Sequence, residues 1–101
     1  MDRSSRAARL ADQIRDYLAL WLNRDFPGAL VSVGSVQLST SGHQATVWLR
    51  FLATTEKSPL RGIIQKTSYY QFQLRQSLNR AAVPAIAFRL ELSDVENDTL
   101  I

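Results

Sequence analysis

The stretch that decides the fold runs from residue 57 to residue 90, KSPLRGIIQKTSYYQFQLRQSLNRAAVPAIAFRL. Ser58 followed by Pro59 is typical of a helix start, because the hydroxyl caps free N–H groups and proline suits the first helical position. Apolar residues then recur at helical spacing before they alternate as in a strand, over residues 85–92. The two halves of the helix are out of phase, and we predict a bend or break at Thr67-Ser68, where hydroxyl groups compete for backbone hydrogen bonds. The expected core side of this helix carries Leu60, Ile63, Ile64, Thr67, Tyr70, Leu74, Leu78 and Ala81.

The same stretch is strongly basic. It contains six Lys and Arg residues and no Asp or Glu. A row of donors and one aromatic ring follows its outer side at steps near four. That row consists of Arg61, Gln65, Tyr69, Gln76 and Arg80. Such a surface suits the phosphates and 2′-hydroxyls of RNA.

Two strands joined by a short turn precede this stretch, over residues 30–39 and 44–52. The first changes its alternation at Gly34-Ser35, which predicts a β-bulge, because a bulge inserts one unpaired residue. The turn covers residues 40–43. The expected core sides of the three strands carry Val31, Val33, Val36 and Leu38, then Ala45, Val47, Leu49 and Phe51, and lastly Ile86, Phe88, Leu90 and Leu92.

The N-terminal segment predicts an amphipathic helix over residues 5–23, with Ser4 or Ser5 as its cap. Phe26-Pro27-Gly28 ends it. Arg3, Arg6 and Arg9 align on its polar side, where positive charge opposes the helix dipole. These arginines are therefore either a binding feature or simply a solvated face.

The fold class that follows is α+β, with the order helix, strand, strand, kinked helix, strand. Three strands form one sheet and the helices pack on one of its faces. With 101 residues, 46% of them hydrophobic, the chain is expected to be one domain over residues 1–101, with residues 1–4 and 94–101 frayed. The absence of cysteine excludes disulfides and thiolate metal sites. The sequence lacks a spanning segment and a secretory signal, so a soluble cytoplasmic protein is expected.

Charge is uneven along the chain. The net charge is +3, but residues 91–101 carry −4 and the rest +7. A basic body suits a polyanionic partner, although small proteins are often mildly basic.

Side chains that could carry catalysis are few. The only histidine, His43, lies in the turn without an orienting partner, and the four glycines match no nucleotide-binding fingerprint. We therefore expect no enzyme, no cofactor and no metal. Trp48 beside Arg50 could stack on a base or, as we favour, cover the sheet.

Several motifs together resemble ribosome-binding factor A, a bacterial assembly factor of the small ribosomal subunit with a type II KH-like domain. The opening pattern appears as Arg6-Ala-Ala-Arg9-Leu10-Ala11, and the hairpin as VGSVQLSTSGHQATVWLRF. The end appears as VPAIAFRLELS, residues 83–93. Lys66-Thr67-Ser68 stands where the family has Ala-X-Gly. Because serine adopts positive φ less readily than glycine, we expect the kink to be gentler or displaced.

The resemblance implies a monomer that binds 16S rRNA on the free 30S subunit and assists its maturation and rRNA processing without catalysis. Two alternatives stay open, which are a KH-like module for another RNA and a protein-interaction domain that uses the sheet face around Trp48. The expected RNA-binding residues are Arg6, Arg9, Arg61, Gln65, Lys66, Tyr69, Arg75, Arg80 and Arg89.

Overall fold

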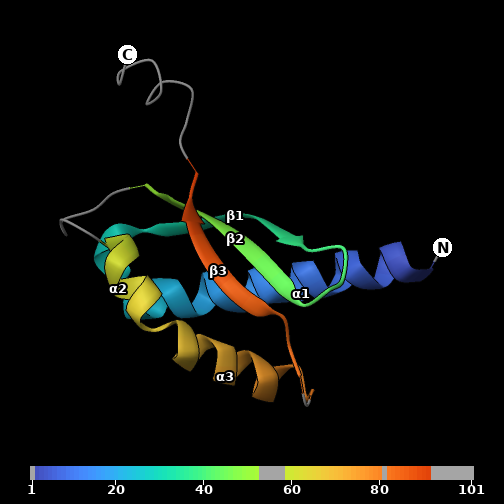
Figure 1. Ribbon diagram of the computed structural model, residues 1–101. Helices are drawn as coiled ribbons and strands as arrows, with labels where there is room; N and C mark the ends of the chain where they lie inside the picture. Colours follow the sequence, from blue (N-terminus) through green and yellow to red (C-terminus); the bar gives the residue numbers. More distant parts are fainter. Residues whose placement is uncertain (1, 53–58, 81, 92–101) are drawn as a thin grey trace.

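The elements follow one another in the expected order. The computed structural model describes residues 2–52, 59–80 and 82–91, and the side chains of those residues from Arg6 onward. The expectations for Ser58, Ala81, Leu92 and the frayed ends at Met1 and 94–101 lie outside the described residues. The elements are α1 (Asp2–Asp25), a 3-10 helix (Pro27–Ala29), β1 (Val31–Leu38), β2 (Gln44–Phe51), α2 (Pro59–Gln65), α3 (Thr67–Ser77) and β3 (Ala85–Leu90) (Figure 1).

The three strands form one mixed sheet in the order β1-β2-β3. β1 and β2 are antiparallel, whereas β2 and β3 are parallel. The β1–β2 register shifts between Val33 and Val36, which confirms the bulge. Because of this extra residue, all four apolar side chains of β1 reach the core side.

The core lies between one face of the sheet and the helices. On β2, Ala45, Val47 and Leu49 are fully buried, whereas Arg50, which follows Leu49, is exposed. This alternation confirms the expected faces of β2 and the layered α+β architecture. The helices contribute Ile14, Leu18, Trp21, Leu22, Ile63, Tyr70 and Leu74 to this core. Within the described part of the chain, no helix is long and apolar enough to cross a membrane.

α1 is longer than expected at both ends. It begins at Asp2, so Ser4 and Ser5 lie inside the helix and the prediction that one of them caps it was wrong. It continues to Asp25, and Pro27 then starts the 3-10 turn. The turn returns the chain into β1 through Leu30, which adopts a left-handed conformation with φ 47°.

The break in the second helical segment is real and lies at Lys66, one residue before the predicted Thr67-Ser68. The Lys66 amide donates to the Ile63 carbonyl at 3.0 Å, which tightens the last turn of α2. The Thr67 hydroxyl donates to the Ile64 carbonyl at 2.6 Å, so it satisfies a carbonyl that the break leaves without its helical partner. Lys66 itself has φ −99°, which any residue adopts, so the break forms without glycine.

Two predicted core residues were wrong. Ile64 is 48% exposed, because the break changes the helical phase and only Ile63 continues the buried side toward Tyr70. Leu90 is 40% exposed, because it is the last residue of an edge strand. Periodicity predicts which side of a helix or strand is apolar, but it gives no information about how far along the element that side stays buried.

Gln71 on α3 fixes the entry into β3. Its Nε2 donates to the carbonyls of Val83 and Pro84, and its Oε1 accepts from the Ile86 amide at 3.0 Å. One side chain thus pairs with backbone groups on both sides of the point where β3 begins. This contact places β3 against both β2 and α3.

Candidate nucleic-acid interface

Part of the expected RNA-binding row surrounds the helix break. Arg61 and Gln65 on α2 are exposed, as is Tyr69 in the first turn of α3. Lys66 lies between the two helices and is half-buried. The break therefore presents one cation, one amide and one aromatic ring to solvent, with a second cation drawn inward.

What draws Lys66 inward is a polar cluster at the end of α1. We call it the Asp25 cluster, and it consists of Arg24, Asp25, Lys66, Tyr69 and Tyr70. Asp25 Oδ2 accepts from the Tyr70 hydroxyl at 2.7 Å and from Lys66 Nζ at 3.2 Å. Arg24 Nε donates to Asp25 Oδ1 at 2.9 Å, and Arg24 Nη2 donates to the Tyr69 hydroxyl at 3.4 Å. The cluster joins α1 to both sides of the helix break.

Aromatic rings complete the surroundings of the Lys66 ammonium. Nζ lies 4.9 Å from the ring centroid of Tyr69 and 5.8 Å from that of Phe26, within the range of cation–π attraction. Gly62 makes room for the Phe26 ring, since a Cβ at Gly62 would lie 3.0 Å from Phe26 Cε1. Glycine in α2 is thus explained by packing.

The Asp25 cluster shifts the pKa of its two central groups in opposite directions. Hydrogen bonds from Arg24, Tyr70 and Lys66 hold the pKa of Asp25 far below its usual range, against the opposing effect of burial. Burial, followed by the hydrogen bond to Asp25, raises the pKa of Tyr70. At neutral pH the cluster therefore holds a carboxylate between an ammonium and a neutral phenol. Both cations of the cluster, Arg24 and Lys66, contact this one carboxylate, so only part of the positive charge of Lys66 is offset there.

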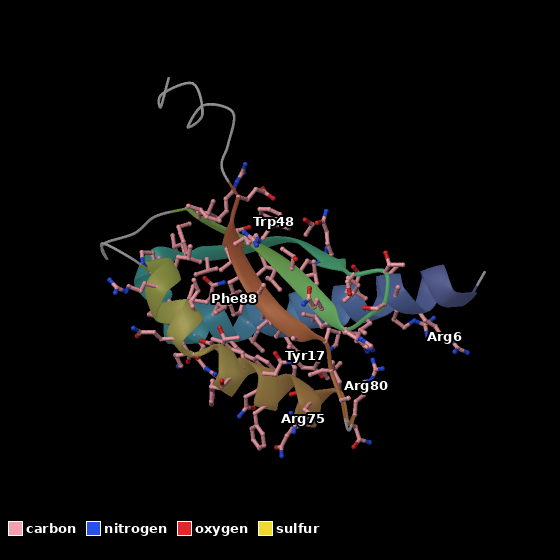
Figure 2. The ribbon with its side chains drawn as sticks, in the orientation of Figure 1. Arg6, Tyr17, Trp48, Arg75, Arg80 and Phe88 are labelled. Atoms are coloured by element: carbon pink, nitrogen blue, oxygen red, sulfur yellow. The ribbon has the colours of Figure 1, made fainter. Side chains whose placement is uncertain are left out.

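A second group of predicted residues meets at the other end of α1. A hollow of about 480 Å³ lies between the first turns of α1, the turn after β1 and the segment after α3, and we call it the basic hollow. Figure 2 shows Arg6 and Arg80 at this end of the molecule. The hollow is lined by Arg6, Ala7, Arg9, Leu10, Gln13, Leu38, Ser41, Gly42 and Arg80.

Local backbone geometry brings Arg80 to this place. α3 ends at Ser77, and Asn79 follows with φ 52°, the left-handed conformation typical of a helix end. The Arg80 amide donates to the Arg75 carbonyl at 3.1 Å, which folds the chain back over the end of the helix. The turn at the opposite wall is held by the Ser39 hydroxyl, which contacts the Ser41 hydroxyl and accepts from the Gln44 amide.

His43 lies beside the basic hollow. A neighbouring hollow of about 220 Å³ shares Leu10, Gly42 and Arg80 with it and adds His43 and Pro84. The expected solvated turn position of His43 is confirmed by its exposure. Sequence reasoning did not place it near any arginine, because nothing in the spacing relates residue 43 to residue 80.

The remaining expected residues lie apart from both groups. Arg75 is exposed on α3 (Figure 2). Arg89 is exposed on β3, directly opposite Trp48 in the register, and so belongs to the sheet face away from the core. The nine residues therefore divide among the helix break, the basic hollow, the outer side of α3 and the open sheet face.

Trp48 on that open face is only half-exposed. Its Nε1 donates to Gln37 Oε1 on β1 at 3.3 Å, and Nε of its neighbour Arg50 lies 3.6 Å from Glu91 Oε1. These contacts support the interpretation that Trp48 covers the sheet.

The residues that sequence reasoning missed are Arg24 and Asp25. The signal that could have found them was Tyr70, since a tyrosine on the core side of a helix needs a partner for its hydroxyl. An acid at the end of α1 was the natural candidate, but only the tertiary structure brings residue 25 next to residue 70.

Comparison with solved structures identifies the fold. The crystal structure of ribosome-binding factor A from Thermus thermophilus matches with a TM-score of 0.70 and 22% identity, over 83% of this chain and 94% of that one. A solution structure from Thermotoga maritima, described as a candidate ribosome-binding factor A, matches with a TM-score of 0.64 and 26% identity, over 83% and 85% of the two chains.

A third match is a homology model of the Thermus thermophilus protein fitted into a cryo-EM map of its complex with the 30S subunit. Its TM-score is 0.59 at 18% identity, over 76% of this chain and 90% of that one. No family model matches the sequence. No curated protein matches it either. The chain thus has the fold of ribosome-binding factor A, as its motifs predicted.

Proposed function

We propose that the chain is a ribosome-binding factor that binds 16S rRNA on the free 30S subunit and assists its maturation and rRNA processing. The observation that carries the proposal is the fold, which extends over 94% of the ribosome-binding factor A from Thermus thermophilus. The association of such a protein with the 30S subunit is the basis for the partner. The protein acts as a monomeric module of residues 1–101, in the cytoplasm, where ribosomes assemble.

In this role the chain works by binding alone. Arginines neutralise phosphates, and each cation that does so releases counterions from the RNA. Exposed Arg61, Arg75, Arg80 and Arg89 serve this purpose, as do Arg6 and Arg9, whereas Gln65 and the Tyr69 ring contact unpaired nucleotides. Lys66 contributes by holding the helix break and, through its remaining exposed surface, by contact with RNA.

The test is co-sedimentation of the tagged protein with ribosomal particles at low and high salt. We expect association with free 30S subunits and not with whole ribosomes, weakening as salt increases. No association with either particle would overturn the proposal.

A second measurement locates the surface. Arg61→Glu combined with Arg80→Glu should abolish co-sedimentation. The control is Arg15→Glu with Arg50→Glu, which changes the charge equally at two arginines that already lie near carboxylates. Circular dichroism confirms that both variants are folded. Equal loss in the two variants would mean that overall charge, and not this surface, controls binding.

A further inference from the structure

The basic hollow differs from those parts of the surface where arginines are paired with acids. Arg15 pairs with Asp12 and Asp16, Arg24 with Asp25, and Arg50 with Glu91. By contrast, the described lining of the basic hollow contains three arginines and no carboxylate. Unbalanced positive charge in a concave site focuses an attractive potential for anions.

These arginines come from separate parts of the chain. Arg6 and Arg9 lie one turn apart on α1, and Arg80 approaches from the segment after α3. An arginine presents five N–H donors in a planar fork, which matches the oxygens of a phosphate. Two elements that face each other across one hollow can therefore hold a phosphate from both sides.

The size of the site indicates more than a single small ion. A volume of about 480 Å³ lies within the roughly 300–1,000 Å³ of ordinary ligand pockets. The hollow beside His43 continues it past Arg80. It adds His43, Ala82, Val83 and Pro84 beside Arg80, so a polymer bound in the basic hollow has room to continue there.

The basic hollow is also remote from the helix break. Arg6 and Asp25 are nineteen residues apart on the same helix, which corresponds to about 28 Å at 1.5 Å per residue. At the break, Lys66 and Arg24 both contact Asp25, whereas the described lining of the hollow holds no such acid.

We propose that the basic hollow is a separate binding site for the phosphate backbone of RNA, with Arg9 and Arg80 as its principal ligands and Arg6 extending it. The inference rests on the proposed function, since it requires that the chain binds RNA. It assigns the strongest phosphate contact to the start of α1 and the end of α3, and leaves the helix break to contact nucleotides through Tyr69 and Gln65.

The test uses the full chain and two probes, a mixed-sequence single-stranded RNA of about twelve nucleotides, within the usual site size of single-strand binders, and purified free 30S subunits. Arg9→Gln and Arg80→Gln should each weaken RNA binding about fivefold at roughly 0.1 M salt and lower the slope of log affinity against log salt by roughly 0.7–0.9. Arg15→Gln, with the same change in charge on the same helix as Arg9, should change affinity less than about twofold.

Amide NMR of the wild-type chain gives an independent measurement. The amide signal of Gly42, in the wall of the hollow, should shift on addition of the RNA. The affinity obtained from the saturation of this shift should equal the affinity of the wild type in the RNA-binding measurements. Saturation of this shift by ATP at concentrations where the RNA has no effect would assign the hollow to a mononucleotide and overturn the proposal.

Failure of this inference is distinguishable from failure of the proposed function. If the wild type binds RNA and 30S subunits while Arg9→Gln and Arg80→Gln behave like Arg15→Gln, the basic hollow is not a phosphate site and the proposed function still stands. If the wild type binds neither probe, both are overturned.

Discussion

The hydroxyl of Tyr70 donates a hydrogen bond of 2.7 Å to Oδ2 of Asp25, and it joins α3 to the end of α1 across 45 residues of sequence. Tyr70 is fully buried and its ring stacks near Trp21 and meets Phe88 edge-on. The side chain therefore has an apolar role through its ring and a polar role through its hydroxyl. This contact links the core to the charged residues at the helix break.

Replacing Tyr70 with phenylalanine should lower the free energy of unfolding by about 1.5–3 kcal/mol, because the ring is kept while a hydrogen bond to a carboxylate is lost. Urea denaturation at neutral pH measures this change. Tyr17→Phe is the control, since its hydroxyl makes only a 3.5 Å contact with the Ser77 carbonyl. Equal effects of the two substitutions would contradict the importance of the Asp25 contact.

The stability contributed by Asp25 should depend on pH. Because its pKa is lower in the folded chain than in the unfolded one, the contribution is complete above the unfolded value of about 3.9 and is lost as the pH falls below it. Asp25→Asn should therefore cost about 2–3 kcal/mol at neutral pH and progressively less below about pH 4. Denaturation of both proteins across this range measures the difference.

Asp12→Asn is the matched control for that series. Asp12 is exposed and its Oδ1 lies 3.7 Å from Arg15 Nη2, so its removal should cost no more than about 0.5 kcal/mol at any pH. A pH-independent difference between the wild type and Asp25→Asn would show that the charge of Asp25 is not what stabilises the fold.

Leu30→Gly should stabilise the protein by about 0.5–1 kcal/mol, because glycine removes the steric cost of a left-handed conformation. Leu30 has φ 47°, so the folded chain carries this steric cost. Its side chain is 51% exposed, so the substitution removes little buried apolar surface. Thermal unfolding provides the measurement. Asn79→Gly, at φ 52°, should give a smaller gain, because asparagine tolerates this conformation better. A loss of stability in Leu30→Gly would mean that its side chain packs more than its exposure indicates.

Gln71→Glu should destabilise the chain by about 2 kcal/mol, because a carboxylate retains the acceptor for Ile86 but places negative charge against the carbonyls of Val83 and Pro84. Hydrogen exchange should show the loss concentrated in β3. Gln76→Glu, at an exposed position of the same helix, is the control. Uniform loss of protection across the sheet would contradict a specific role in placing β3.

Much of the fold was predictable because it depends on short-range patterns. Alternation placed the buried side of β2, and the change of phase at Gly34-Ser35 placed the bulge. The break between α2 and α3 was also visible as a mismatch between two helical periods. Its position was one residue off, since the hydrogen bond from the Lys66 amide to the Ile63 carbonyl ends α2 one residue before Thr67.

The candidate site was less predictable, because a charged residue in a sequence carries no information about its neighbours in space. The sequence treated Lys66 and Arg80 as equivalent members of one basic surface. In the structure Lys66 contacts Asp25, which it shares with Arg24, whereas Arg80 meets Arg6 and Arg9 in the basic hollow.

For the basic stretch from residue 57 to 90, the sequence by itself determined the composition, the helical and extended parts and the existence of the break. Hydrophobic periodicity and backbone preferences act over a few residues, and they can be recognised without any partner. Which cations face solvent and which are balanced depends on contacts across 41 to 45 residues, such as those of Asp25 with Lys66 and Tyr70. Only the tertiary structure decides those contacts, because they form when the end of α1 packs against the break between α2 and α3.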